Sequence, residues 1–288
     1  MNLPDLLSNP DVKKRICESL AEDLGPQAVD VTADALVPEG RPATAHLVAR
    51  QTGVLAGASV AAEVFRQVDP SLKIEEGMTD GSPMEHGDVV LTLSGSARSI
   101  LVGERTALNF IQRMSGVATL TRQYVEEANN PDVKLLDTRK TTPTLRAFEK
   151  YSVLCGGGNN HRMGLYDMAM LKDNHLAYWA ENHDSGISGA VQAVRDRFPD
   201  RLVEVEVDTI EQLQEVLPAK PDWVLLDNMP PIVLRDCVKL CEGICKTEAS
   251  GGVNLDTIRE IAKTGVNAVS VGALTHSAPA ADLALDWA

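Results

Sequence analysis

The sequence predicts an α/β protein in two parts, and three patterns support this prediction. The first hundred or so of its 288 residues mix short strands and helices that proline and glycine separate at close intervals. An amphipathic helical pattern then extends from about residue 103 to residue 129. From residue 133 onward, short apolar runs alternate with helical segments, which is typical of parallel βα units. We therefore expect an α+β part followed by a βα barrel.

The N-terminal part contains four expected elements before the long helix. A helix is expected over 11–24, because its apolar residues recur at every fourth position. The other three are strands over 43–50 and 89–94 and an alanine-rich helix over 53–67. Together they predict an α+β domain with several hairpin-like turns.

Two domains are expected, with a boundary near Ser115 and Gly116 inside the long helical pattern. The N-terminal domain then takes residues 1–115 and the catalytic domain takes residues 116–274. The last residues, 275–288, are expected to pack back on the first domain.

In the C-terminal part, polar residues end the apolar runs at the interval of one βα unit. The expected elements are strands over 133–136, 168–171, 203–207, 222–226, 244–250 and 267–271, with helices over 209–217, 230–241 and 254–263. Glu206, Asp227, Ser250 and Gly272 end successive runs, separated by 21, 23 and 22 positions in the sequence. This repeat predicts parallel strands whose C-terminal ends meet at one mouth.

Lysines follow the first two expected strands, so the same mouth should carry positive charge. Lys140 follows the first strand and Lys172 ends the second. We expect both to converge with the polar strand ends. The alternative is that each polar residue only caps the next helix, and this stays open for Asp227 and Ser250. It explains Glu206 poorly, because a carboxylate inside the apolar run VEVEV is costly without a partner.

Composition excludes several classes of function. The formal charge of −14 and pI near 4.9 argue against binding of nucleic acid or of an anionic membrane surface. No apolar run approaches the roughly 18 residues of a membrane span. The first twenty residues lack a signal-peptide pattern, and the five cysteines are too sparse for a disulfide framework, so a cytoplasmic location is expected. Cys237, Cys241 and Cys245 permit a metal site, but buried helical cysteines are the simpler interpretation.

Cations gather in residues 135–175 of this acidic chain. They lie around the Gly156–Gly158 loop and are Arg139, Lys140, His161, Arg162, Lys172 and His175. Arginine and lysine bind carboxylates and phosphates, and this much charge exceeds the need of a neutral ligand. The alternative is that these cations only form a solvated charged face. Their positions among glycines and at strand ends make that interpretation less suitable.

The carboxylates Glu206 and Asp227 complete the expected site. They can hold Mg²⁺, bind sugar hydroxyls, or stabilise developing positive charge. The sequence contains neither a P-loop pattern nor a GxGxxG turn between a strand and a helix, so nucleotide hydrolysis and dinucleotide binding have little support. Cations for phosphates and carboxylates for ribose or Mg²⁺ together favour the transfer of a phosphorylated sugar.

At these residues the chain closely resembles the quinolinate phosphoribosyltransferases, also called carboxylating nicotinate-nucleotide pyrophosphorylases. The motifs that carry the resemblance are GERTALNFIQRMSGVAT (103–119), LLDTRKTTP (135–143), NHR with KDNH (160–175), VEVEV (203–207), LLDN (225–228), EASGG (248–252) and SVGALTHSAPA (270–280). They occur in order over nearly the whole chain. The resemblance implies an N-terminal α/β sandwich followed by an open, incomplete α/β barrel.

The resemblance also implies a reaction and roles for individual residues. Quinolinate would react with 5-phosphoribosyl-1-pyrophosphate, in the presence of Mg²⁺, to give nicotinate mononucleotide, pyrophosphate and CO₂ for NAD synthesis. Arg139, His161, Arg162 and Lys172 would hold the quinolinate carboxylates, and Lys140 would meet the pyrophosphate. Glu206 and Asp227 would serve the ribose and Mg²⁺, the metal being held mostly through the substrate and water.

The remaining roles that the resemblance implies concern phosphate binding and assembly. Thr138 would contact substrate, and Ser250, Gly251, Gly252 and Gly272 would line the 5-phosphate pocket. Arg105 would act across the interface of a homodimer, and further assembly into a hexamer is left open. Neither nucleic acid nor a membrane is an expected partner.

The chain departs from the family pattern at two places. Thr144 stands where the family usually has glycine, and this change at a helix start should be tolerable. The EDLG signature at 22–25 lacks its second glycine, which leaves the conformation of residues 25–32 open.

Three alternative functions remain to be distinguished. A related phosphoribosyltransferase acting on nicotinate would bind one carboxylate, which makes the cation cluster excessive. A Schiff-base aldolase on the same barrel would use Lys140 or Lys172 as nucleophile. A non-catalytic metabolite-binding protein is opposed by the retention of every polar strand end.

Overall fold

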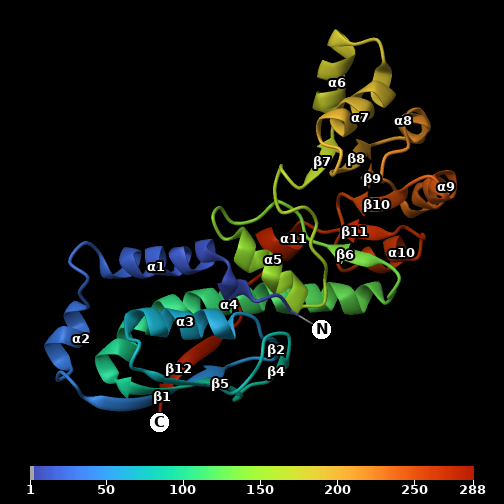
Figure 1. Ribbon diagram of the computed structural model, residues 1–288. Helices are drawn as coiled ribbons and strands as arrows, with labels where there is room; N and C mark the ends of the chain where they lie inside the picture. The colour runs from blue at the N-terminus through green and yellow to red at the C-terminus, as the bar shows by residue number, and fades with distance from the viewer. Residues whose placement is uncertain (1–2) are drawn as a thin grey trace. The chain divides into compact units, whose positions relative to one another are not determined.

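The computed structural model describes residues 3–288, which form two compact units (Figure 1). The first unit takes residues up to Arg122, together with Thr141–Gly157 and Leu274–Ala288. The second unit takes Gln123–Lys140 and Gly158–Ala273. Helix α4 (Ala97–Ala128) contributes to both units, and the expected domain boundary inside this helix stays a prediction.

The first unit is built on a four-stranded antiparallel sheet in the order β12-β1-β5-β3. The strands of this sheet are β1 (Pro42–Ala49), β3 (Lys73–Glu76), β5 (Val89–Ser96) and β12 (Leu283–Trp287). The unit also contains β2 (Gly53–Val54) and β4 (Pro83–Met84), which form a separate two-stranded sheet. Its helices besides α4 are η1 (Leu6–Ser8), α1 (Pro10–Leu24), α2 (Val31–Leu36), α3 (Ala58–Val68), α5 (Arg146–Cys155) and most of α11 (Ala273–His276). Helix α3 packs against β5, and α1 packs against α3, so this unit has layers of helix and sheet.

Local sequence explains where α1 begins and ends. The Asn9 side chain accepts a hydrogen bond from the Asp11 N–H, and Pro10 occupies the first turn, where a missing N–H has no cost. The helix stops at Gly25, which has a φ of 66°. Its buried residues are Val12, Ile16 and Leu20, which are spaced four apart as the sequence pattern predicted.

The helix expected over residues 53–67 is shorter than predicted. Residues 53–54 instead form β2, which pairs antiparallel with β4. Helix α3 begins at Ala58, after Gly57 in the left-handed conformation, and the Asp80 Oδ1 accepts from the Ala58 N–H at 2.9 Å. The short strand was missed because its partner lies thirty residues away in the sequence.

A buried ion pair anchors the chain just after Lys140. Glu149 on α5 accepts from the Thr142 N–H at 3.0 Å and from its hydroxyl at 2.8 Å. The Arg113 guanidinium on α4 lies 2.7 Å from the same carboxylate and also donates to the Ala278 carbonyl at 2.7 Å. Because a buried carboxylate is costly without such partners, these contacts fix the start of the segment that returns to the first unit.

The second unit contains a six-stranded parallel sheet in the order β6-β11-β10-β9-β8-β7. The strands are β6 (Lys134–Leu136), β7 (Met168–Leu171), β8 (Leu202–Val207), β9 (Trp223–Asp227), β10 (Lys246–Ser250) and β11 (Ala268–Ser270). The helices that connect them are α6 (Asp173–Asn182), α7 (Gly186–Arg197), α8 (Ile210–Val216), η2 (Leu217–Ala219), α9 (Pro231–Cys241) and α10 (Ile258–Ala262). The series of strands ends at β6 and β7, so the fold is an α/β barrel that stays open.

Strand pairing places the C-terminal ends of neighbouring strands at the same level. Ser250 at the end of β10 pairs with Asp227 at the end of β9, and Glu206 on β8 pairs with Leu225. Helices α7 and α8 pack beside β8, α9 beside β10, and α10 beside β11. The expected strands of this part are all present, whereas α10 is shorter than its predicted range of 254–263.

Within residues 3–288, no helix combines the length and the apolar character needed to cross a membrane.

Thr144 adopts an unfavourable backbone conformation. Its φ is 69°, in the left-handed region, which a β-branched residue rarely enters and glycine enters freely. Thr144 is exposed and directly precedes the turn into α5. Glycine, which the family pattern has at this position, would adopt this conformation without strain.

We predict that Thr144→Gly stabilises the protein. Relief of about 1–3 kcal/mol of backbone strain should exceed the roughly 0.4–1 kcal/mol lost to a more flexible unfolded chain. The unfolding free energy from urea titration should rise by about 1 kcal/mol. Thr52→Gly is the matched control, since Thr52 is exposed in a loop without positive φ, and it should lower the stability. A loss of stability in both variants would contradict the prediction.

Candidate active site

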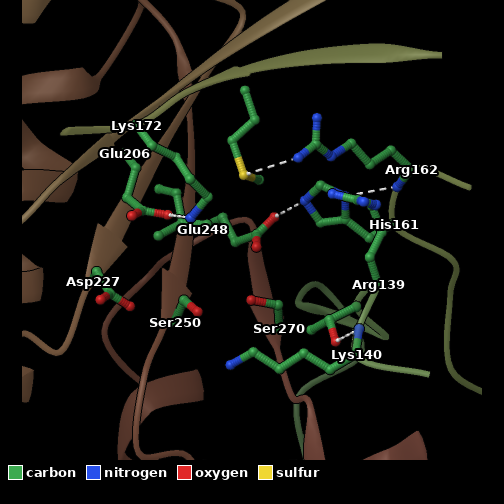
Figure 2. A pocket seen from close by; sticks show the side chains of 13 residues that line it. Arg139, Lys140, His161, Arg162, Lys172, Glu206, Asp227, Glu248, Ser250 and Ser270 are labelled. Carbon is green, nitrogen blue, oxygen red and sulfur yellow. Dashed lines mark hydrogen bonds and ion pairs between the residues drawn. The ribbon is translucent and has the colours of Figure 1, made fainter. Parts of the chain in front are cut away.

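A cavity of about 280 Å³ lies at the C-terminal ends of the strands in the second unit (Figure 2). The residues that line it are Thr138, Arg139, Lys140, His161, Arg162, Met170, Lys172, Glu206, Leu225, Asp227, Glu248, Ser250 and Ser270. The structure therefore brings together nine of the residues that the sequence singled out. In Figure 2, Arg139, His161 and Arg162 lie on one side of the view, and Glu206 and Asp227 lie on the other.

Parallel pairing explains how distant residues reach this cavity. Thr138 and Lys140 follow β6, and Lys172 follows β7. Asp227 and Ser250 end β9 and β10. Because all these strands run in the same direction, their C-terminal ends meet on one side of the sheet.

Four other predicted residues do not line the cavity. Arg105 is an exposed residue of α4 in the first unit. Gly251 and Gly252 directly follow Ser250, and Gly272 lies just after β11.

The sequence reasoning missed Met170, Leu225, Glu248 and Ser270 as lining residues. Glu248 precedes Ser250 by two positions on one strand, so side-chain alternation places both on the same face. Ser270 stands in the same relation to Gly272. This period of two was a usable signal for both residues.

Lys172 and Glu206 form an ion pair on the cavity wall (Figure 2). Their side chains are 41% and 19% exposed, so water still reaches the lysine. Glu206 holds the ammonium group at the end of β7 beside β8. The positive charge of Lys172 is thereby balanced within the protein before any anion is bound.

Arg162 is held by the strand that follows it. Its Nη1 donates to the Met168 carbonyl at 3.0 Å, and Nη2 lies 3.6 Å from the Met170 sulfur. Burial, followed by the positive charge of Arg139, lowers the pKa of Arg162 from its ordinary value. Two guanidinium groups that repel each other at a cavity are stabilised by an anion between them, which favours an anion-binding site.

His161 lies among two buried carboxylates. Its Nε2 is 3.2 Å from Glu204 Oε2 and 3.3 Å from Glu248 Oε2. Burial opposes a charge on the imidazole, whereas the two carboxylates favour it, so they act on the pKa of His161 in opposite directions. Burial, partly offset by His161 and reinforced by Glu248, raises the pKa of Glu204 to about 7.

Two backbone contacts fix the position of His161. Its N–H donates to the buried Asp137 side chain at 2.9 Å. Its Nδ1 accepts from the Arg162 N–H at 2.6 Å. An acceptor at Nδ1 opposes full protonation of the ring, so this contact and the carboxylates act in opposite directions. The contact prevails, because two N–H groups directed at each other at this distance would repel strongly, so Nδ1 carries no proton.

The loop after β10 exposes backbone groups near the cavity. Gly251 and Gly252 have φ values of 90° and 63°, and Asn228 has a φ of 53°. The Asn228 N–H donates to the Ser250 carbonyl at 2.8 Å, and its side chain donates to Asp227 at 2.7 Å. Left-handed residues in succession can direct N–H groups toward one point, which is a common way to bind phosphate.

Two family models match the chain. Residues 30–115 match the N-terminal domain of quinolinate phosphoribosyl transferase, and residues 117–286 match the C-terminal domain.

Named relatives extend over almost all of the chain. It is 40% identical over 281 residues to a probable nicotinate-nucleotide pyrophosphorylase [carboxylating] of Bacillus subtilis, covering 97% of this chain and 94% of the relative. It is 42% identical over 294 residues to the chloroplastic nicotinate-nucleotide pyrophosphorylase [carboxylating] of Arabidopsis thaliana, covering 96% of this chain and 82% of the relative. The solved nicotinate-nucleotide pyrophosphorylase of Francisella tularensis superposes with a TM-score of 0.90 at 37% identity, covering 100% of both chains.

We predict that the loop after β10 does not tolerate a side chain at Gly251. A Cβ there would lie 2.2 Å from Asn228 Oδ1 and 2.8 Å from its backbone nitrogen, and the φ is positive. Gly251→Ala should therefore lose about 1–3 kcal/mol through crowding, in addition to about 1–3 kcal/mol of backbone strain.

Gly243→Ala separates the two effects. Gly243 has a φ of 74°, but nothing lies within 4 Å of a Cβ built on it. In urea unfolding, the control should therefore lose only the strain contribution. Equal losses in both variants would show that Asn228 does not restrict this loop.

Proposed function

This chain belongs to the quinolinate phosphoribosyltransferase family, and we propose that it transfers the 5-phosphoribosyl group of 5-phosphoribosyl-1-pyrophosphate to quinolinate. The products are nicotinate mononucleotide, pyrophosphate and CO₂, and the reaction serves NAD biosynthesis. One observation carries the proposal: a single cavity combines cations for carboxylates and phosphates with carboxylates suited to a ribose or Mg²⁺.

The cations divide between the two substrates. Arg139, Arg162 and Lys172 hold the two carboxylates of quinolinate, with His161 beside them in the wall. For Lys172, an incoming carboxylate takes the place that Glu206 occupies in the ion pair. Lys140 contacts the pyrophosphate that leaves.

The phosphate and ribose of the other substrate are held at the strand ends of β9 to β11. Ser250, Gly251, Gly252 and Gly272 supply hydroxyl and backbone N–H groups to the 5-phosphate, the two left-handed glycines supporting this role. Thr138 contacts substrate at the end of β6.

Glu206 and Asp227 have the donor type that Mg²⁺ prefers. Both carboxylates line the cavity, and Asp227 Oδ2 accepts from Asn228, which orients the group. We propose that they bind the metal mostly through water and the pyrophosphate. When bound, Mg²⁺ neutralises charge on the leaving group.

The proposed chemistry needs charge stabilisation more than proton transfer. As pyrophosphate leaves, ribosyl C1 develops positive charge, which Glu206 or Asp227 stabilises. The quinolinate nitrogen attacks C1, so that the C1–N bond forms as the C1–O bond breaks. The resulting pyridinium accepts the electron pair of the breaking C–CO₂⁻ bond, and the ring carbon then takes up a proton.

A Schiff-base mechanism agrees poorly with Lys172. A Schiff-base lysine must present its nitrogen to a substrate carbonyl, whereas the Lys172 nitrogen is held against the Glu206 carboxylate. The cavity therefore supports electrostatic binding by this lysine.

Release of CO₂ tests the proposed function. With 5-phosphoribosyl-1-pyrophosphate and Mg²⁺, the enzyme should convert quinolinate to nicotinate mononucleotide with one CO₂ per turnover. Its kcat/KM for nicotinate should be at least about tenfold lower, because a single carboxylate leaves part of the cation cluster unpaired. Faster turnover of nicotinate without CO₂ would assign the chain to the alternative reaction.

We also propose a cytoplasmic location.

We further propose a homodimer in which Arg105 of one subunit enters the active site of the other. Arg105 is exposed on α4 and therefore able to meet a partner. Arg105→Ala and Lys172→Ala should each be nearly inactive. If subunits exchange, an equal mixture should regain up to about a quarter of wild-type activity, because half of the dimers are mixed and each mixed dimer contains one intact site.

The control for this experiment is the mixture of each variant with itself, which should stay inactive. Mixed dimers can be isolated by placing different affinity tags on the two variants. Inactive mixed dimers would show that Arg105 acts within its own subunit or has another role.

A further inference from the structure

We propose that Glu204 and Glu248 are positioning residues that hold the imidazole of His161, and with it the backbone of Arg162, against the carboxylate-binding wall. This inference rests on the proposed function. It concerns two buried glutamates, of which Glu248 also lines the cavity and Glu204 does not.

The two glutamates lie one step deeper than the predicted strand-end residues. Glu204 precedes Glu206 by two positions on β8, and Glu248 precedes Ser250 by two positions on β10. Side chains alternate along a strand, so Glu204 shares a face with Glu206, and Glu248 shares a face with Ser250. Glu204 is 0% exposed and Glu248 is 2% exposed, so the carboxylates meet inside the open barrel.

Burial of two carboxylates requires a physical reason. A buried charge is strongly unfavourable unless it is paired, and even a neutral polar group without a partner is unfavourable there. Both glutamates approach the same nitrogen, His161 Nε2, at 3.2 and 3.3 Å. Figure 2 shows the Glu248 contact, with Arg162 next to the ring.

The contact at the other ring nitrogen decides which tautomer this arrangement selects. Nδ1 accepts from the Arg162 N–H, so it has no proton of its own. In a neutral imidazole the single proton then lies on Nε2, where it faces the two carboxylates. Each glutamate thus places a carboxylate oxygen within 3.3 Å of Nε2, where its negative charge favours a proton on that nitrogen.

The same argument separates positioning from metal binding. His161, Glu204 and Glu248 offer three possible ligand atoms within 4.8 Å of one another. A metal on Nε2 would need that nitrogen without its proton, while Nδ1 already accepts a hydrogen bond. The ring would then carry a negative charge, which is unfavourable at neutral pH.

The two glutamates affect the binding of substrate by way of Arg162. The ring holds the Arg162 N–H at 2.6 Å, and the Arg162 guanidinium in turn donates to the Met168 carbonyl. Rotation of the imidazole would therefore release the backbone from which this guanidinium extends. We expect the glutamates to affect the binding of quinolinate more than the binding of the 5-phosphate, although the phosphate loop begins two residues after Glu248.

Paired substitutions test the role. Glu248→Leu removes the acceptor, whereas Glu248→Gln keeps an acceptor oxygen of the same reach. The leucine variant should raise the KM for quinolinate by about tenfold or more, with the KM for 5-phosphoribosyl-1-pyrophosphate within about twofold of wild type, and the glutamine variant should recover most of the loss. Glu204→Leu and Glu204→Gln should show the same order.

Thr247→Val is the matched control on β10. Thr247 is 2% exposed and alternates with Glu248, so it faces the opposite side of the strand. A general effect of disturbing β10 would raise both KM values in this variant as well. Equal effects of Glu248→Leu and Glu248→Gln, or a rise in both KM values, would overturn the positioning role.

A spectroscopic measurement tests the proposal without relying on activity. In wild-type protein with ¹⁵N-labelled histidine, His161 should show a protonated Nε2 and an unprotonated Nδ1 at pH 7. Glu248→Leu should shift the population toward the other tautomer, and Glu248→Gln should not. A protonated Nδ1 in the wild type, or stoichiometric binding of added Zn²⁺ that Glu248→Gln abolishes, would overturn the proposal. Failure of the CO₂ assay alone would overturn the proposed function and leave the tautomer result standing.

Discussion

Parallel pairing of the six strands in the second unit is the constraint on which the site depends. It forces the C-terminal ends of β6 to β11 to one side, so that residues far apart in the sequence share one cavity. The buried strand residues are mostly apolar, with Glu204 and Glu248 as exceptions. Each βα unit then contributes one or two polar groups, and opposite charges face each other because they come from different strands.

The cavity is surrounded by charged groups, and the burial or close approach of these charges would be unfavourable without neighbours of opposite charge. Burial and then the neighbouring Arg139 lower the pKa of Arg162, and Glu204 is buried beside Glu248. The approach of His161 to both glutamates offsets part of the cost of burying these two carboxylates. Such dense compensation fixes side chains in one arrangement, which is what binding of two polyanions requires.

Much of this architecture could be predicted from sequence, because strand ends repeat at the length of a βα unit. Glu206, Asp227 and Ser250 were identified from spacing alone. Glu204 and Glu248 were missed as positioning residues, because alternation gives the face of a strand and not the depth or the neighbour. The positive φ of Thr144 and the pairing of β2 with β4 depend on contacts between distant residues, which local sequence does not contain.

The ion pair between Lys172 and Glu206 gives the cavity an internal competitor for anions. An inorganic ion such as chloride must displace a carboxylate that is already bound to the lysine, and it gains few other contacts in return. A ligand with several acidic groups can replace Glu206 and engage the arginines at the same time. The cavity thereby discriminates by the number and spacing of charges, so that abundant simple salts in a cell occupy it weakly.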